Sequence, residues 1–192
     1  YTPGKTSVSV TKNWDDANNQ DGKRPESIKV QLYADGSPVG EEITLTPDDG
    51  WTYTWSGLAV KKAGHNIAYT VKETEIPEGY TSGEPTGNMT DGFTITNSYT
   101  PETIDVSGTK TWDDGNNQDG TRPGSITVNL LANGVKYASK KVEPDASGNW
   151  EYSFTDLPKY SNKQVIVYTI TEDAVENYST AIDGYDVTNS YT

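Results

Sequence analysis

Several residue types are missing or scarce in this sequence, and each shortage excludes a kind of site. There is no cysteine, so neither a disulfide nor a thiolate zinc site can form. Small extracellular domains often use disulfides to compensate for modest cores, so an extracellular protein of this composition needs another covalent or packing device. No run of residues resembles a transmembrane segment or a signal peptide, and we therefore expect a soluble piece, mature or excised.

Positive charge is also scarce. The chain has 15 Lys and Arg residues against 28 Asp and Glu residues, a formal net charge of −13. The excess is shared, with 8 basic against 14 acidic residues over 1–100 and 7 against 14 over 101–192. An acidic surface on both halves argues against nucleic acid and against insertion into, or binding to, an anionic membrane.

Tyrosine and tryptophan are the abundant large side chains. There are 13 Tyr and 5 Trp residues but only 2 Phe, and hydrophobic residues make up only 32% of the chain. Aromatic and β-branched side chains fit a pleated surface that is buried on one face. The composition therefore favours two-faced antiparallel strands over helices.

The sequence repeats itself once. Residues 11–32 reappear as residues 109–130, an offset of 98 positions. Three shorter pairs follow in the same order: residues 50–58 with 149–157, 69–73 with 168–172, and the pentapeptide TNSYT at 96–100 with 188–192. We predict two tandem domains, 1–100 and 101–192, the second having lost residues between Tyr178 and Asp183. The linker Pro101-Glu102-Thr103 is so short that we expect a semi-rigid, end-to-end rod.

Each copy is predicted to consist of strands. The strands expected in the first copy are residues 5–14, 27–34, 39–46, 50–57, 66–74 and 91–99. Turn pairs such as Asp21-Gly22 and Asp35-Gly36 separate them, and only Val60–Gly64 is expected to form a short helical turn. Short strands at this spacing predict a β-sandwich.

Three polar residues in each copy fall on the apolar face of their strand. Alternate side chains of a strand share one face, which groups Lys12 with Val10, Glu73 with Val71, and Asn97 with Ile95. The matched residues of the second copy are Lys110, Glu172 and Asn189. Each domain is thus predicted to direct one lysine, one glutamate and one asparagine inward, from its first, penultimate and last strands.

Two interpretations of these triads remain open. The simpler one is a buried Lys–Glu ion pair supported by an asparagine hydrogen bond, although burial of charges costs several kcal/mol. The other is covalent. A desolvated lysine that has lost its proton is a nucleophile, and a desolvated carboxyl group that keeps its proton is a general acid. The amine would attack the asparagine carboxamide, ammonia would leave, and proximity in the core would supply most of the acceleration.

The ordered motifs TKxWDD, Y-T-[VI]-x-E and TNSYT resemble those of CnaB-type domains, the B-region repeats of Gram-positive collagen adhesins and related pilus proteins. The resemblance covers essentially the whole chain, twice. It implies an all-β fold of two tandem Ig-like (CnaB, prealbumin-like) β-sandwiches. It also implies a self-formed Lys–Asn isopeptide bond in each: Lys12 to Asn97 promoted by Glu73, and Lys110 to Asn189 promoted by Glu172. No sorting signal or hydrophobic tail is found, so anchoring and ligand-binding parts are expected outside this fragment.

Other candidates are weaker. Glu75 and Asp173 neighbour the nominated acids. Asp173 lies one residue from Glu172 and should therefore point outward, and Glu75 lies where the strand runs into Ile76-Pro77. Lys72 is also expected to point to solvent. The loops 14–22 and 112–120 resemble calcium loops, yet the EF-hand glycine is misplaced, so Asx-turn structure is favoured and no metal or cofactor is expected.

The matched aromatic residues of 51–55 and 150–154 favour a shared core over a sugar-stacking platform. His65 has no counterpart in the second copy, and no Ser-His-Asp set is duplicated, so we do not expect a turnover enzyme.

The leading functional expectation is a monomeric structural stalk module. It would belong to an extracellular, cell-wall-anchored adhesin or pilus of a Gram-positive bacterium and would contact neighbouring repeats. The alternative is a ligand-binding adhesin domain that contacts a host protein or glycan. A binder should show an exposed apolar or aromatic patch unique to one copy, whereas a spacer should share only core positions.

Overall fold

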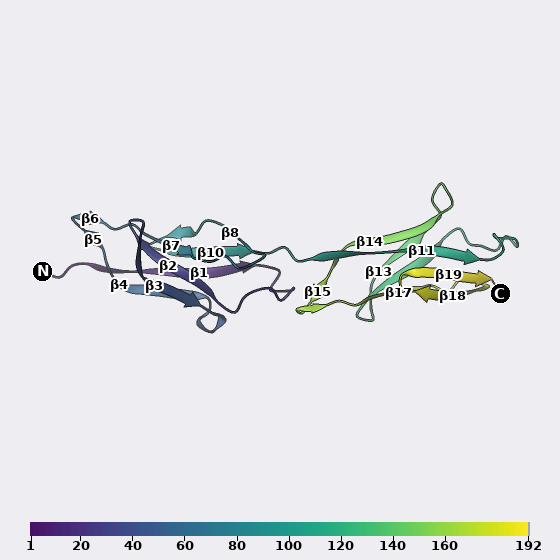
Figure 1. The fold of residues 1–192 in the computed structure, drawn as a ribbon, viewed down its shortest axis with the longest axis horizontal. Helices are drawn as coiled ribbons and strands as arrows, with labels where there is room; N and C mark the ends of the chain where they lie inside the picture. The colour runs from purple at the N-terminus through teal and green to yellow at the C-terminus, as the bar shows by residue number, and fades with distance from the viewer. Residues whose placement is uncertain (192) are drawn as a thin grey trace. The chain divides into compact units, whose positions relative to one another are not determined.

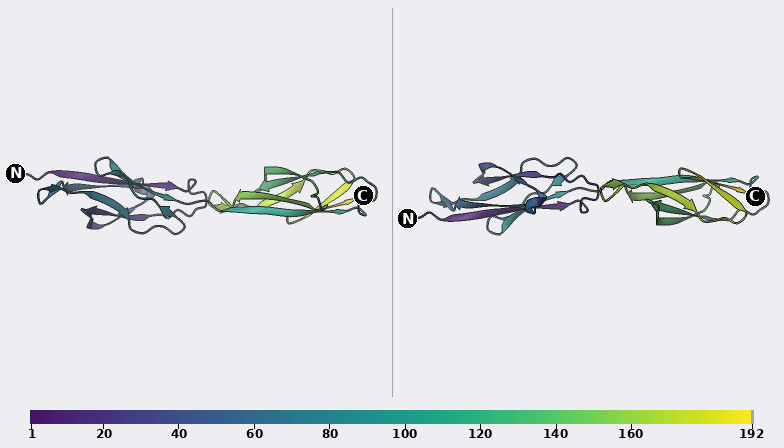
Figure 2. Two further views of the ribbon diagram at one scale, coloured as in Figure 1. Left: turned by 90° about the horizontal axis from the view of Figure 1, so that it is seen from above. Right: turned by 90° about the horizontal axis from the view of Figure 1, so that it is seen from below.

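The computed structural model describes residues 1–191, and the last residue of the second TNSYT segment, Thr192, lies outside them. The chain divides into two compact units, one from Tyr1 to Pro101 and one beginning at Glu102. Nearly all regular structure in both is β-strand (Figure 1), which confirms the prediction of an all-β chain with two sandwiches. The two further views in Figure 2 show the strands of each unit stacked in layers.

The first domain is built from two sheets and a small hairpin. One sheet has the order β4-β1-β10-β8, with β9 also paired to β10; the other has the order β3-β2-β7. The strands are β1 (Lys5–Asp15), β2 (Ile28–Ala34), β3 (Ser37–Leu45), β4 (Thr52–Ala59), β7 (Tyr69–Glu73), β8 (Thr81–Ser82), β9 (Thr86–Asn88) and β10 (Gly92–Ser98). The hairpin consists of β5 (Lys61–Lys62) and β6 (His65–Asn66), and a 3-10 turn, η1 (Pro47–Asp49), precedes β4.

The second domain repeats this plan. Its sheets have the orders β14-β11-β19-β18 and β13-β12-β17, and β15 and β16 form the hairpin. The strands are β11 (Thr103–Asp113), β12 (Ile126–Ala132), β13 (Val135–Val142), β14 (Trp150–Pro158), β15 (Tyr160–Ser161), β16 (Gln164–Val165), β17 (Tyr168–Glu172), β18 (Tyr178–Asp183) and β19 (Asp186–Tyr191).

The first and last strands of each domain lie side by side and run parallel. In the first domain, β1 pairs with β10 so that Lys12 is opposite Ile95 and Trp14 is opposite Asn97. In the second, β11 pairs with β19, and Trp112 is opposite Asn189. All other strand pairs in the described residues are antiparallel. The strands by which the chain enters and leaves each domain are therefore direct neighbours.

The core of each domain lies between its two sheets. Val8 and Val10 of β1 face Val30 and Leu32 of β2, and all four are almost fully buried. Such alternation of buried and exposed positions is the pattern of a strand with one face on the core. The second domain has an equivalent cluster, in which Val106, Val128, Leu130 and Val187 are buried.

Two local predictions were wrong. Val60–Gly64 is not a helical turn, because Ala63 and Gly64 both have positive φ, 50° and 84°, and close the β5–β6 hairpin. Two central residues with positive φ define the type I′ turn that matches the twist of a hairpin. The glutamate strand is also not the penultimate one, because β8 and β9, or β18 alone in the second domain, come between it and the last strand. The shortened segment of the second copy is the continuous strand β18.

Candidate functional site

In the first domain the structure brings the three inward polar residues together. Lys12 Nζ lies 2.9 Å from Glu73 Oε2, and Asn97 Nδ2 donates a hydrogen bond of 3.0 Å to Glu73 Oε1. The carboxyl group therefore bridges the lysine nitrogen and the asparagine amide. Asn97 Oδ1, by contrast, is buried with no hydrogen-bond partner among the described residues.

The two sheets supply different members of this triad. Lys12 and Asn97 project from the neighbouring parallel strands β1 and β10, two residues out of register with each other. Glu73 comes from the end of β7, which belongs to the opposite sheet and pairs with β2. The lysine and the asparagine thus lie within one sheet, and the acid reaches them across the core.

Burial is nearly complete at this site. Lys12 is 4% exposed, Asn97 is fully buried, and the Glu73 side chain is 2% exposed. Desolvation lowers the pKa of Lys12, and its hydrogen bond and charge interaction with Glu73 oppose this effect. A buried lysine with a lowered pKa is more readily available as a neutral amine than one in water.

The second domain brings the same residues together in a looser arrangement. Lys110 Nζ lies 4.0 Å from Glu172 Oε2 and donates instead to the backbone oxygen of Thr111 at 3.2 Å. Asn189 is fully buried, and neither of its side-chain polar atoms has a hydrogen-bond partner in the described part of the chain. Burial lowers the pKa of Lys110 to about 8, with Glu172 raising it and Arg122 lowering it.

A threonine accounts for part of this difference. Thr180 of β18 is paired with Asn189, and its Oγ1 donates a 2.8 Å hydrogen bond to Glu172 Oε1. The residue paired with Asn97 in the first domain is Ser82, whose hydroxyl contacts the Gly83 carbonyl instead. The carboxyl oxygen that meets the asparagine in the first domain therefore meets a hydroxyl group in the second.

The alternative acids and the alternative lysine lie away from the site. Glu75 and Asp173 are exposed and lie beyond the ends of β7 and β17. Asp173 accepts a hydrogen bond from Asn129 on the outer side of its sheet. Lys72 is exposed, with its nitrogen 5.5 Å from the centre of the Tyr33 ring.

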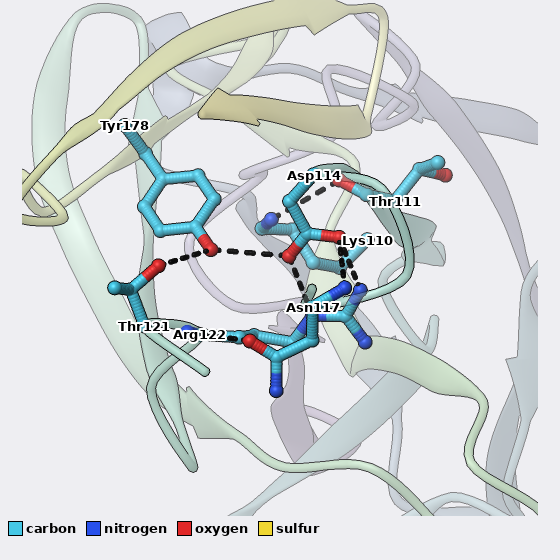
Figure 3. A network of polar contacts seen from close by, with 7 residues as sticks. All are labelled: Lys110, Thr111, Asp114, Asn117, Thr121, Arg122 and Tyr178. Carbon is cyan, nitrogen blue, oxygen red and sulfur yellow. Dashed lines mark hydrogen bonds and ion pairs between the residues drawn. The ribbon is translucent and has the colours of Figure 1, made fainter. Parts of the chain in front are cut away.

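An aspartate–arginine pair beside each triad was missed by the sequence reasoning. Figure 3 shows it in the second domain, where Arg122 Nε and Nη2 donate to Asp114 at 2.9 and 2.5 Å. The backbone N–H of Asn117 and the hydroxyl of Tyr178 also donate to Asp114, at 2.9 and 3.0 Å. The signal available in the sequence was the Asp-x7-Arg spacing, which recurs as Asp16 and Arg24.

The first domain contains the same network. Asp16 accepts hydrogen bonds from Arg24 at 2.7 and 3.0 Å, from the Asn19 backbone at 2.9 Å and from the Tyr80 hydroxyl at 2.8 Å. Both oxygens of this carboxylate are already engaged by protein donors. Within residues 1–191, no group of three acids or histidines is placed to hold a metal ion.

The tryptophan at the end of the first strand packs over each lysine. Lys12 Nζ lies 4.6 Å from the centre of the Trp14 ring, and Lys110 Nζ lies 3.3 Å from that of Trp112. The arginine of the loop contacts the same ring, with its guanidinium carbon 5.3 Å from the ring centre in both domains. One aromatic ring in each domain therefore contacts both cations.

The matched aromatic strands differ between the copies. Trp150, Tyr152 and Phe154 are all buried in the second core. In the first domain Trp55 is buried but Tyr53 is 38% exposed. Gly108 explains part of this difference, because it leaves room for Tyr152, whose hydroxyl donates to the Tyr185 carbonyl.

The fold and the buried triads define a class of protein: a β-sandwich repeat with a lysine and an asparagine on adjacent first and last strands. The Cna protein B-type domain matches residues 8–98 and again residues 106–190, and the chain belongs to that family. It is 51% identical over all 192 residues to a collagen adhesin of Staphylococcus aureus.

The solved structure of two B repeat units of the collagen binding protein of S. aureus is also similar. It superposes with a TM-score of 0.92 at 50% identity, over all of this chain and 51% of that one. The chain spans only 16% of the length of the collagen adhesin. Within residues 1–191, no helix is long and apolar enough to cross a membrane.

Proposed function

We propose that this chain is a structural spacer of a Gram-positive surface adhesin, and that each domain closes itself with a Lys–Asn isopeptide bond. The observation that carries the proposal is the bridging of Lys12 and Asn97 by the buried carboxyl group of Glu73. Replacing a buried ion pair with apolar residues is often neutral or stabilising, so the presence of Lys12 and Glu73 in the core supports a chemical role for them over a purely stabilising one.

The proposed reaction is an intramolecular transamidation. The neutral Lys12 amine attacks Cγ of Asn97 to form a tetrahedral intermediate, and Glu73, which contacts the nitrogen atoms of both side chains, carries a proton between them. The Cγ–Nδ2 bond then breaks. The proton lost by the lysine nitrogen passes through Glu73 to Nδ2, which leaves as ammonia. Lys110, Glu172 and Asn189 would act in the same way, and each domain reacts once without turnover.

Closure would stabilise each domain and limit its extension. The Lys12–Asn97 bond encloses about 85 residues and the Lys110–Asn189 bond about 79, and cross-links of that loop size stabilise by about 4–5 kcal/mol. Because the bond joins the entering and leaving strands, pulling force would pass through it and not through the rest of the fold. A stiff repeat of this kind suits a stalk that is anchored in the cell wall and carries its ligand-binding region elsewhere.

Intact mass tests the proposal directly. Each bond expels one ammonia, so a chain with both bonds should be lighter than its calculated mass by about 34 Da. Tandem mass spectrometry of a digest should then find Lys12 joined to Asn97 and Lys110 joined to Asn189. A mass equal to the calculated value would show that the domains are not cross-linked.

A second candidate function is supported by an apolar patch in the second domain. Val135, Tyr137, Val165 and Val167 are 53–70% exposed, and hydrogen bonds between Val167 and Asn133 hold this region together. The aligned residues of the first domain are Ser37, Val39, Asn66 and Ala68. An exposed apolar patch in one copy alone favours a contact with a protein surface.

Collagen is the ligand to test for this candidate, because the relative is a collagen adhesin. If the patch binds it, the chain should bind immobilised collagen saturably. The Val165→Asn/Val167→Ala variant, which installs the first-domain residues, should then lose that binding. The spacer proposal expects no saturable binding by either protein.

A further inference from the structure

The aspartate–arginine pair beside each triad is linked to the reacting lysine through a tryptophan ring. In the second domain the loop between β11 and β12 folds back so that Arg122 and Asn117 enclose the Asp114 carboxylate (Figure 3). Tyr178 of β18 donates to the same carboxylate and packs edge-on against Trp112, with ring centres 5.0 Å apart. The network thus connects the end of the first strand to the strand that precedes the acceptor.

Trp112 connects this network to the lysine. Its ring contacts Lys110 Nζ at 3.3 Å and the Arg122 guanidinium at 5.3 Å, and it packs edge-on against Trp150. A ring held on several sides cannot swing away, and it therefore limits both the access of water and the positions open to the amine. The first domain repeats the arrangement with Asp16, Arg24, Tyr80 and Trp14.

We propose that Arg122 is a positioning residue for bond formation in the second domain: it fixes Trp112 over Lys110 and places a permanent positive charge near the amine. This inference rests on the proposed isopeptide function. Arg122 touches neither the acceptor asparagine nor the acid, so it acts only through the lysine and the ring.

The charges around Lys110 determine the direction in which its pKa should move when Arg122 is removed. They are Glu172 from β17 and the pair Asp114 and Arg122 from the loop, and the carboxylates favour the ammonium form whereas Arg122 disfavours it. Removing Arg122 takes away the opposing cation and leaves the charge of Asp114 uncompensated. Both changes hold the proton on Lys110 and keep the amine from attacking at neutral pH.

The test follows bond formation in the full chain while it folds. A Lys12→Met background removes the first-domain nucleophile, so each ammonia lost comes from the second domain. The chain is recovered unfolded in urea, its mass is checked against the calculated value, and it is folded by dilution at pH values from 6 to 10. Intact mass against time gives the rate at each pH.

In the parent the rate should rise with pH to a plateau, with its midpoint near the pKa of Lys110, about 8. In the Arg122→Met variant the midpoint should move to higher pH. The rate at pH 7 should fall about tenfold for each pH unit of that movement, and the rate at pH 10 should approach that of the parent. Arg122→Lys, which keeps the charge, should restore the midpoint. Asp114→Asn/Arg122→Met, which removes both charges, should bring it back toward the parent value.

Lys136→Met is the matched control, because it removes an exposed positive charge on β13 away from the site. It should leave the midpoint unchanged. If Arg122→Met slows the reaction equally at every pH, or leaves the midpoint in place, Arg122 contributes only to the stability of the fold and the inference is wrong. If the parent itself loses no ammonia, the proposed function fails and the inference fails with it.

Discussion

At the scale of single residues, the two triads share their composition but not their contacts. Glu73 meets both the lysine and the asparagine of its domain. Glu172 instead meets the hydroxyl of Thr180, and Lys110 is turned toward the Thr111 carbonyl. Strand parity alone predicted that all six side chains point inward. It did not predict this difference, because Thr180 enters the site from a strand that was not expected.

One substitution separates proton transfer by Glu73 from the packing of its side chain. Glu73→Gln keeps the volume and the hydrogen-bonding capacity of the side chain but cannot carry a proton between the amine and the leaving nitrogen. We expect this variant to retain one more ammonia than the parent, about 17 Da, and to melt on the order of 20 °C lower in its first domain. Mass spectrometry and calorimetry measure the two effects.

The matched control for this substitution is Glu75→Gln, two residues further on and exposed. It should leave both the mass and the melting profile unchanged. A Glu73→Gln chain with the full loss of about 34 Da would show that Glu73 does not promote the bond.

The order in which the two bonds form should follow the contacts. Because Lys12 lies 2.9 Å from its acid and Lys110 lies 4.0 Å from its own, we expect the first domain to close sooner after folding. Lys110→Met chains report the first bond alone, and Lys12→Met chains report the second. Intact mass during refolding at one pH gives both rates, and a faster second bond would contradict the expectation.

At the scale of elements, the parallel pairing of the first and last strands is what creates the site. It places the lysine and the asparagine on adjacent strands, and β7 or β17 brings the acid from the other sheet. The periodicity of two in the sequence predicted the inward face of each strand. Sheet membership depends on long-range pairing that no local pattern encodes, so the approach of the acid across the core had to come from the structure.

The short elements were the least predictable. Val60–Gly64 carries little strand pattern, and the turn of the β5–β6 hairpin depends on positive φ at Ala63 and Gly64. The strands β8 and β9 have only two and three residues, too few for alternation to appear. In both cases tertiary pairing, and not local preference, decided the structure.

The contact between β11 and β19 depends on a glycine. A Cβ atom at Gly108 would lie 1.9 Å from the backbone oxygen of Tyr185, the residue before β19, so a side chain there must push β11 away from the start of that strand. Gly108→Ala should therefore destabilise the second domain by about 1–3 kcal/mol. Hydrogen exchange of the β19 amides measures the loss.

Gly124→Ala provides the comparison, since a Cβ atom at Gly124 meets no other atom within 4 Å. Its exchange rates should equal those of the parent. Equal protection of β19 in the Gly108→Ala chain would mean that the strands tolerate the added methyl group without separating.

At the scale of the whole molecule, two domains in one chain place two proposed bonds in series along the polypeptide. With both bonds closed, only residues outside the two enclosed segments can extend under force. If both are open, the enclosed segments of about 85 and 79 residues can release roughly 280 and 260 Å of chain.

Single-molecule pulling from the two ends of the chain distinguishes these cases. The parent should show neither step, and Glu73→Gln/Glu172→Gln should show both. A single variant should show one step, whose length identifies the domain that opened. Long steps in the parent would contradict a mechanical role for the triads, even if its mass showed that some molecules had closed.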